Sequence, residues 1–203
     1  MKNPLILLFL AIFSVSNSFT QSVTIGTQVW TTKNLDAATF RNGDLIPEAK
    51  TDEEWIAAGK NKQPAWCYYE NDIKNGTKYG KLYNWYAVVD ARGLAPAGWH
   101  VPTDEEWTLF LDRDGAGKRI KSTSGWLENG NGTNSSGFSG LPGGCRDSDG
   151  DFSGVGYGGS WWSVSEANAK NAWGRALNYD DSNLRAYLFL RKRLGFSVRC
   201  VKD

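Results

Sequence analysis

Three aspartates at alternating positions in a glycine-containing segment form a candidate group of metal ligands. They are Asp147, Asp149 and Asp151. Hard cations such as Ca²⁺ take oxygen ligands, and alternating carboxylates in a glycine-containing loop are typical of their sites. An EF-hand loop would also need glycine at position 152 and glutamate at position 158, where this chain has Phe152 and Gly158. The segment therefore predicts either a calcium site of another kind or a solvated acidic turn.

Two adjacent tryptophans, Trp161 and Trp162, could form a stacking platform for a ligand. Successive side chains of a strand point to opposite faces, so one indole could serve the core while the other lies exposed. An exposed indole is suited to stacking on a sugar ring or a peptide side chain, whereas burial of both would make them purely structural. Arg175, Asn178 and Asp180 could add directional hydrogen bonds to a ligand at the same surface.

Catalysis that needs an imidazole has one candidate, because His100 is the single histidine of the chain. It lies between Trp99 and Val101 in a predicted strand, which favours a structural role. Hydrolysis by paired carboxylates would instead draw on Asp and Glu side chains whose separation in space decides the question. The candidates are Glu166, Asp180, Asp181 and the acids at 147–151.

Two identical segments, each reading Thr-Asp-Glu-Glu-Trp, predict helix starts at Thr51 and Thr103. In each segment the threonine can accept a hydrogen bond from the third helical residue, whose glutamate can reach back to the threonine backbone. The acidic first turn also suits the positive end of the helix dipole. In the second helix, Trp107, Phe110 and Leu111 follow the spacing of one buried face.

The rest of the chain predicts short strands joined by glycine-rich turns. Residues 122–160 are rich in Gly, Asn, Ser and Asp and are expected to form long loops, of the kind that are often functional. Tryptophan, tyrosine and phenylalanine supply the anchors of the core. Strands are expected at residues 23–25, 28–31, 65–69, 82–89, 173–177, 186–190 and 196–201.

The first 20 residues have the layout of a secretory signal peptide. Lys2 precedes an apolar run that is too short to span a bilayer, and small or polar residues follow it up to Thr20. Cleavage is expected near Thr20 and Gln21, which leaves residues 21–203 as one secreted, periplasmic or cell-surface domain without a transmembrane segment. This domain has equal numbers of basic and acidic residues, so its charge gives no reason to expect a nucleic-acid partner.

The three cysteines, Cys67, Cys145 and Cys200, are an odd number for an exported protein. At most one intramolecular disulfide can form, and Cys200 could pair with either Cys67 or Cys145. A buried, unpaired cysteine that packs as a small apolar residue is the alternative for any of the three.

Six segments along the chain together resemble the Fibrobacter succinogenes major paralogous domain, a family of exported bacterial proteins. The resemblance implies an α+β fold of the C-type-lectin-like kind, in which short helices pack on a twisted antiparallel sheet with long Gly/Asn/Ser/Asp-rich loops. Many relatives carry a cysteine where this chain has Ala95. The segments are residues 28–30, 79–86, 98–107, 137–144, 158–163 and 197–203.

The formylglycine-generating enzymes share this fold and carry similar Pro-Thr-x-x-Glu-Trp and Gly-Gly-Ser-Trp segments. Their oxidation chemistry uses a pair of cysteines a few residues after the second segment, but residues 162–168 of this chain contain no thiol. We therefore expect no such activity, and no cofactor other than calcium.

The expected function is non-enzymatic binding of a glycan or a cell-surface protein outside the cytoplasm. Two alternatives stay open from the sequence. One is a structural component of the cell envelope or surface that has no small ligand. The other is a hydrolase that uses paired carboxylates.

Overall fold

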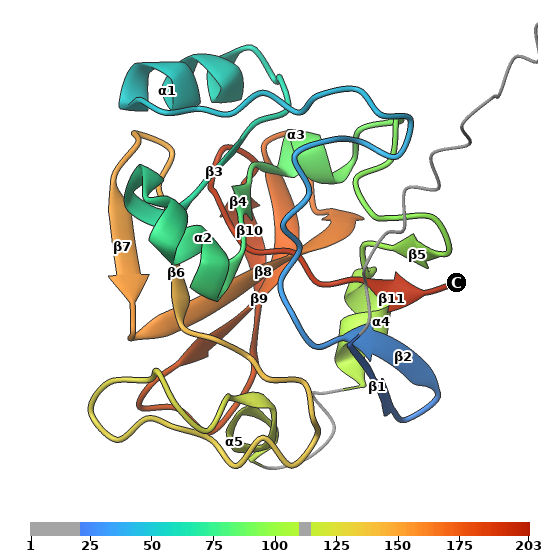
Figure 1. Cartoon of the computed structure of the whole chain (residues 1–203), viewed down its shortest axis with the longest axis vertical. Coiled ribbons are helices and arrows are strands. Elements are labelled where there is room, and N and C mark those ends of the chain that lie inside the picture. The colour runs from blue at the N-terminus through green and yellow to red at the C-terminus, as the bar shows by residue number, and fades with distance from the viewer. Residues whose placement is uncertain (1–20, 110–114) are drawn as a thin grey trace, which may run out of the picture.

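The computed structural model of the chain describes residues 21–109 and 115–203 (Figure 1). The expected signal peptide, residues 1–20, lies outside the described residues, as do Phe110 and Leu111. The fold is mixed α+β, with short helices around curled antiparallel and mixed sheets. In the described part of the chain, every helix is too short or too polar to cross a membrane.

Short helices lie around the sheets, with α1 at the top of Figure 1 and α5 at the bottom. A 3-10 turn, Tyr69–Asn71, precedes α2. The α-helices are α1 (Asp52–Lys60), α2 (Ile73–Tyr79), α3 (Trp85–Val88), α4 (Asp104–Thr108) and α5 (Ala116–Ile120).

One sheet joins the beginning and the end of the domain. Val201 pairs with Trp30 on one side and with His100 on the other, so the C-terminal strand lies between two strands from earlier parts of the chain. The order β1-β2-β11-β5 is formed by β1 (Ser22–Ile25), β2 (Gln28–Thr31), β11 (Val201–Lys202) and β5 (Trp99–His100).

The largest sheet forms the centre of the molecule (Figure 1). Its long strands pair antiparallel, whereas β6 is parallel to β8 through Gly144 and Gly159. A third sheet has two short strands, β3 (Trp66–Cys67) and β4 (Leu82–Tyr83). The order β10-β9-β8-β6-β7 consists of β10 (Arg185–Arg191), β9 (Asn171–Asn178), β8 (Gly158–Glu166), β6 (Gly143–Arg146) and β7 (Phe152–Val155).

Both predicted capping boxes are confirmed. The Thr51 hydroxyl accepts from the Glu54 backbone N–H at 3.2 Å, and the Glu54 carboxylate accepts from the Thr51 N–H at 3.3 Å. At Thr103 the equivalent distances are 3.2 and 2.7 Å, with Glu106 as the partner. The repeated segment therefore starts two helices by the same local chemistry.

The expected strand over 82–89 is interrupted by a helix. Asn84 caps α3 because its side-chain oxygen accepts from the Ala87 N–H at 3.0 Å, and asparagine is among the preferred capping residues. The expected loops over 122–160 also contain β6, β7 and the start of β8. Over 196–201, the long predicted strand is reduced to bridges and the short β11.

Trp161 and Trp162 point to opposite faces of β8, as expected, but both indoles are fully buried. Trp161 donates to Asn34 Oδ1 at 2.9 Å and packs against Phe138. Trp162 donates to the Tyr83 carbonyl at 2.7 Å on the other side. The prediction that one of them is an exposed platform is wrong, because α4 covers one part of β8 and α3 another.

We predict that Trp161→Ala destabilises the domain by about 3–5 kcal/mol, because removal of a buried indole leaves a large cavity and an unsatisfied acceptor on Asn34. Urea unfolding monitored by circular dichroism measures this loss. Val29→Ala, on the nearby partly buried β2, should cost much less. A loss below about 1 kcal/mol for Trp161→Ala would contradict the role of this indole in the core.

Candidate functional site

Arg175, which the sequence suggested as a ligand contact, is a buried structural residue. It is 1% exposed, and its guanidinium pairs with the Asp104 carboxylate and donates to the Asp104 carbonyl at 3.0 Å. These contacts attach the start of α4 to β9. The prediction of a ligand-binding Arg175 is therefore wrong, because helix α4 occupies the space in which a ligand would lie.

The predicted calcium loop is organised by an arginine. Asp147 accepts from the backbone of the next residue at 2.6 Å, and Asp149 accepts from the Asp151 N–H at 3.5 Å. The described residues contain no group of three metal-ligating side chains that could hold an ion. The buried Arg146 guanidinium instead donates to the Gly150 carbonyl at 3.0 Å. The three carboxylates do not converge within the described residues, so the structure contradicts the predicted calcium site and agrees with the acidic turn.

All three cysteines are free thiols, so the structure contradicts the predicted disulfide of Cys200 with Cys67 or Cys145. Cys67 and Cys200 belong to different core clusters, which keeps them apart. Burial raises the pKa of Cys67 to about 11 and that of Cys200 to about 12. Cys145 is half-buried, and its sulfur lies 3.4 Å from the Ser153 hydroxyl.

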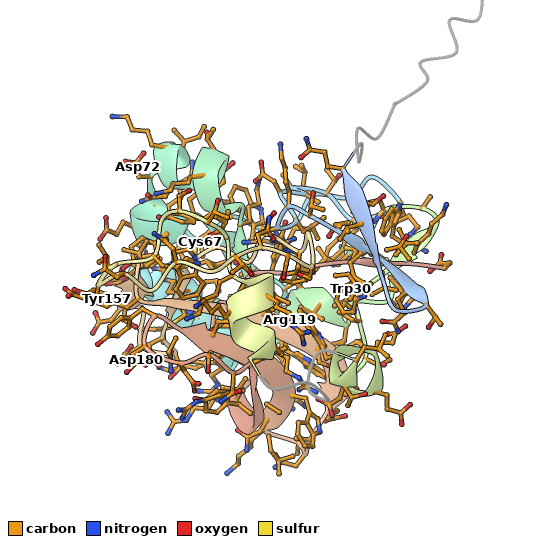
Figure 2. All side chains as sticks on the ribbon, turned by 90° about the horizontal axis from the view of Figure 1, so that it is seen from below. Trp30, Cys67, Asp72, Arg119, Tyr157 and Asp180 are labelled. Atoms are coloured by element: carbon orange, nitrogen blue, oxygen red, sulfur yellow. The ribbon has the colours of Figure 1, made fainter. Side chains whose placement is uncertain are left out.

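Asn178 and Asp180 lie beside a pair of tyrosines that the sequence analysis did not select. Tyr157 is 46% exposed, and its ring meets the Tyr179 ring edge-on at a centroid distance of 5.3 Å. Tyr157 and Asp180 lie along the same edge of the molecule in Figure 2. We call the surface of Tyr157, Asn178, Tyr179 and Asp180 the tyrosine face.

Backbone contacts hold the tyrosine face in place. The Tyr179 N–H donates to the Tyr157 carbonyl at 2.8 Å. From beneath, the buried Lys121 ammonium donates to the carbonyls of Tyr179, at 3.0 Å, and Asp181, at 2.7 Å. Gly158 pairs with Asn178 across the two strands and has no side chain that would cover the amide. The face is therefore preorganised, because its turn is tied to the interior.

The sequence around Tyr157 contains a pattern that could have indicated an exposed ring. Tyr157 stands between Gly156 and Gly158, so its direct neighbours in the chain offer no side chain against which the ring could pack. An aromatic ring flanked in this way is available either to a distant part of the chain or to a ligand. Here Tyr179 takes one edge of the ring and leaves the rest exposed.

The sequence model of the Fibrobacter succinogenes major domain matches residues 23–202, which is nearly all of the described chain. The chain belongs to this family. None of the curated proteins and none of the solved structures matches it. The family assignment confirms the resemblance noted from the motifs and adds no ligand or activity.

In this member of the Fibrobacter succinogenes major domain family, His100 is held between two carboxylates. Its Nε2 lies 2.7 Å from Glu106, the residue that completes the capping box of α4, and its Nδ1 lies 2.7 Å from Asp203. The imidazole therefore connects α4 to the end of the chain. This arrangement agrees with the structural role expected for His100.

The two carboxylates also determine the charge state of His100. Burial lowers the pKa of His100, but the hydrogen bonds and charges of Glu106 and Asp203 outweigh burial and raise it above its usual 6.5. The pKa of Glu106 is lowered, because its hydrogen bonds from Thr103 and His100 outweigh burial, which raises it. The ion pair stabilises the fold best where the imidazole is protonated and the carboxylate is ionised.

We predict that His100 titrates above pH 6.5, and that its contribution to stability is complete below 6.5 and is lost as pH rises through the raised pKa. The contribution of Glu106 is present above its usual 4.5 and is lost as pH falls through its lowered pKa. Because the chain has one histidine, its ring proton gives one NMR titration curve on a protein without a histidine tag. Asp203→Asn should move the midpoint down, and a wild-type midpoint at or below 6.5 would contradict the arrangement.

Proposed function

We propose that this chain is an exported, non-enzymatic binding module of C-type-lectin-like fold, and that its tyrosine face binds a glycan. The observation that carries the proposal is the exposed ring of Tyr157 beside the polar side chains of Asn178 and Asp180. It takes over the stacking role that the sequence analysis gave to Trp161 or Trp162.

Stacking on Tyr157 fits the chemistry of sugars. The axial C–H groups of a sugar ring form a weakly apolar patch that packs on an aromatic face, while the phenol hydroxyl can hydrogen-bond at the rim. Because Tyr179 meets the Tyr157 ring edge-on, part of the conformational cost of ordering that ring is met before a ligand arrives. A preorganised ring binds more tightly than a free one of the same area.

The polar groups of the tyrosine face would orient a bound sugar through directional hydrogen bonds. The Asn178 amide offers two N–H donors and one acceptor, and the exposed Asp180 carboxylate offers only acceptors. Neither side chain makes a hydrogen bond within residues 21–109 and 115–203 that would have to be broken first. Sugar hydroxyls both donate and accept, so they can satisfy both residues at once.

The carboxyl pKa values and ion pairs of the described acidic residues bear on the hydrolase alternative. A general acid for glycoside hydrolysis needs a raised carboxyl pKa. In the described ranges, the resolved shifts of carboxyl pKa are downward at Asp90, Glu106 and Asp181, in each case with help from hydrogen bonds. The candidate Glu166 forms an ion pair with Lys192. These observations favour binding over hydrolysis.

We predict that the purified domain binds glycans on an array and that Tyr157→Ala weakens the binding by about tenfold or more, because a stacked ring contributes on the order of 1.5 kcal/mol. Tyr157→Phe should keep most of the affinity. Tyr187→Ala is the matched control, since Tyr187 is a similarly exposed tyrosine on β10.

Three results would contradict the proposal. A folded wild type that binds no glycan would favour a protein ligand or a purely structural role. Equal losses for Tyr157→Ala and Tyr187→Ala would show that the tyrosine face is not the site. Turnover of a bound glycan would favour the hydrolase alternative.

A further inference from the structure

A pocket of about 340 Å³ opens between the first hairpin and helix α5. One part of its wall is apolar and is formed by Ile25, Leu109 and Ile120. The other part is polar and includes Thr24, Ser135 and Arg119. Arg119 belongs to α5, which lies at the centre of the view in Figure 2. The volume lies in the range of small-molecule sites, and so does this mixture of an apolar wall with few polar groups.

The half-buried Arg119 guanidinium makes no hydrogen bond or ion pair within the described ranges. Its backbone, by contrast, is fixed, because the Arg119 carbonyl accepts from the Ser136 N–H at 3.2 Å and from the Ser136 hydroxyl at 3.0 Å. Arg146 and Arg199, which are fully buried, each donate to several protein acceptors. Within residues 21–109 and 115–203, the Arg119 backbone is held in position while its charge has no protein acceptor.

The lining of the pocket favours an anion over a cation or a neutral ligand. Among the described lining residues none is an aspartate or glutamate, and Arg119 carries the one charged side chain. A guanidinium presents two parallel N–H donors that match the two oxygens of a carboxylate. Thr24 and Ser135 add hydroxyls at the exposed rim.

We propose that this pocket binds a monosaccharide-sized sugar acid, whose carboxylate pairs with the Arg119 guanidinium. The hydroxyls of Thr24 and Ser135 hydrogen-bond to those of the sugar, and Ile25 and Ile120 pack on its ring. The site is separate from the tyrosine face and does not depend on it.

The test is calorimetric titration of the domain with D-glucuronate, with D-glucose as the uncharged counterpart and hexanoate as an acid without hydroxyls. Glucuronate should bind at least about tenfold more tightly than either, since it alone satisfies both the guanidinium and the hydroxyls. Arg119→Gln should weaken glucuronate binding by about tenfold or more. Thr24→Trp, which fills the pocket from an exposed strand position without changing its charge, should also weaken it.

Two further variants serve as controls. Lys118→Gln removes a neighbouring exposed cation of the same helix, and Tyr157→Ala alters the tyrosine face. Both should leave glucuronate affinity within about twofold of wild type. The proposal is wrong if glucuronate does not bind, if glucose or hexanoate binds as tightly, or if Lys118→Gln weakens binding as much as Arg119→Gln does.

Discussion

The packing of this domain depends on one buried amide, the side chain of Asn34. Its oxygen accepts from the Trp161 indole at 2.9 Å and from Arg199 Nε at 2.7 Å. Its nitrogen donates to the Tyr79 carbonyl at 2.7 Å and to the Ser197 hydroxyl at 3.1 Å. All four hydrogen-bonding positions of the amide are used. The early chain, the end of α2, the central sheet and the C-terminal segment therefore meet at one group.

Arg199 extends this network to the glycine-rich loops. It is fully buried, and burial lowers its pKa. Its guanidinium donates to the carbonyls of Thr31 at 2.7 Å, Phe138 at 2.8 Å and Ser139 at 2.9 Å. A buried charge is costly unless such acceptors surround it. Displacement of the loop that carries Phe138 and Ser139 would therefore leave the Arg199 guanidinium without these two carbonyls as hydrogen-bond partners. The loop at 137–140 directly follows the pocket residues Ser135 and Ser136. It is held by Asn34 and Arg199, which lie near the two ends of the domain.

The features that the sequence predicts correctly are those encoded by neighbours in the chain. The two Thr-Asp-Glu-Glu-Trp segments start helices because all the groups of a capping box lie within four residues. The hairpin of β1 and β2 and the alternation of Trp161 and Trp162 are equally local. The helix at α3 was missed although its signal, an asparagine cap at Asn84, is also local, since aromatic residues there favoured a strand.

The features that could not be predicted depend on contacts between distant residues. Whether Trp161 is exposed depends on Asn34, 127 positions away, and on the position of α4. The acidic loop at 147–151 has the residue types of a cation site, but only the fold shows that its described carboxylates do not converge on one point. Arg146, 5.0 Å from the Trp55 ring, instead holds the loop through the Gly150 carbonyl. Tyr157 gains its role only when the turn that carries Tyr179 folds back beside it. Candidate binding residues can be identified from their residue types. Whether their side chains are exposed depends on the tertiary structure.

The claim that the Asn34 network holds the loop at 137–140 is tested most directly by hydrogen exchange measured residue by residue. In Asn34→Ala, the amides of residues 137–140 should exchange at least about tenfold faster than in wild type, while the amides of α1 change little. Asn84→Ala, which removes another buried asparagine, should accelerate exchange at α3 and leave this loop unchanged. Unchanged exchange at 137–140 in Asn34→Ala, or acceleration of the same size in both variants, would contradict the account.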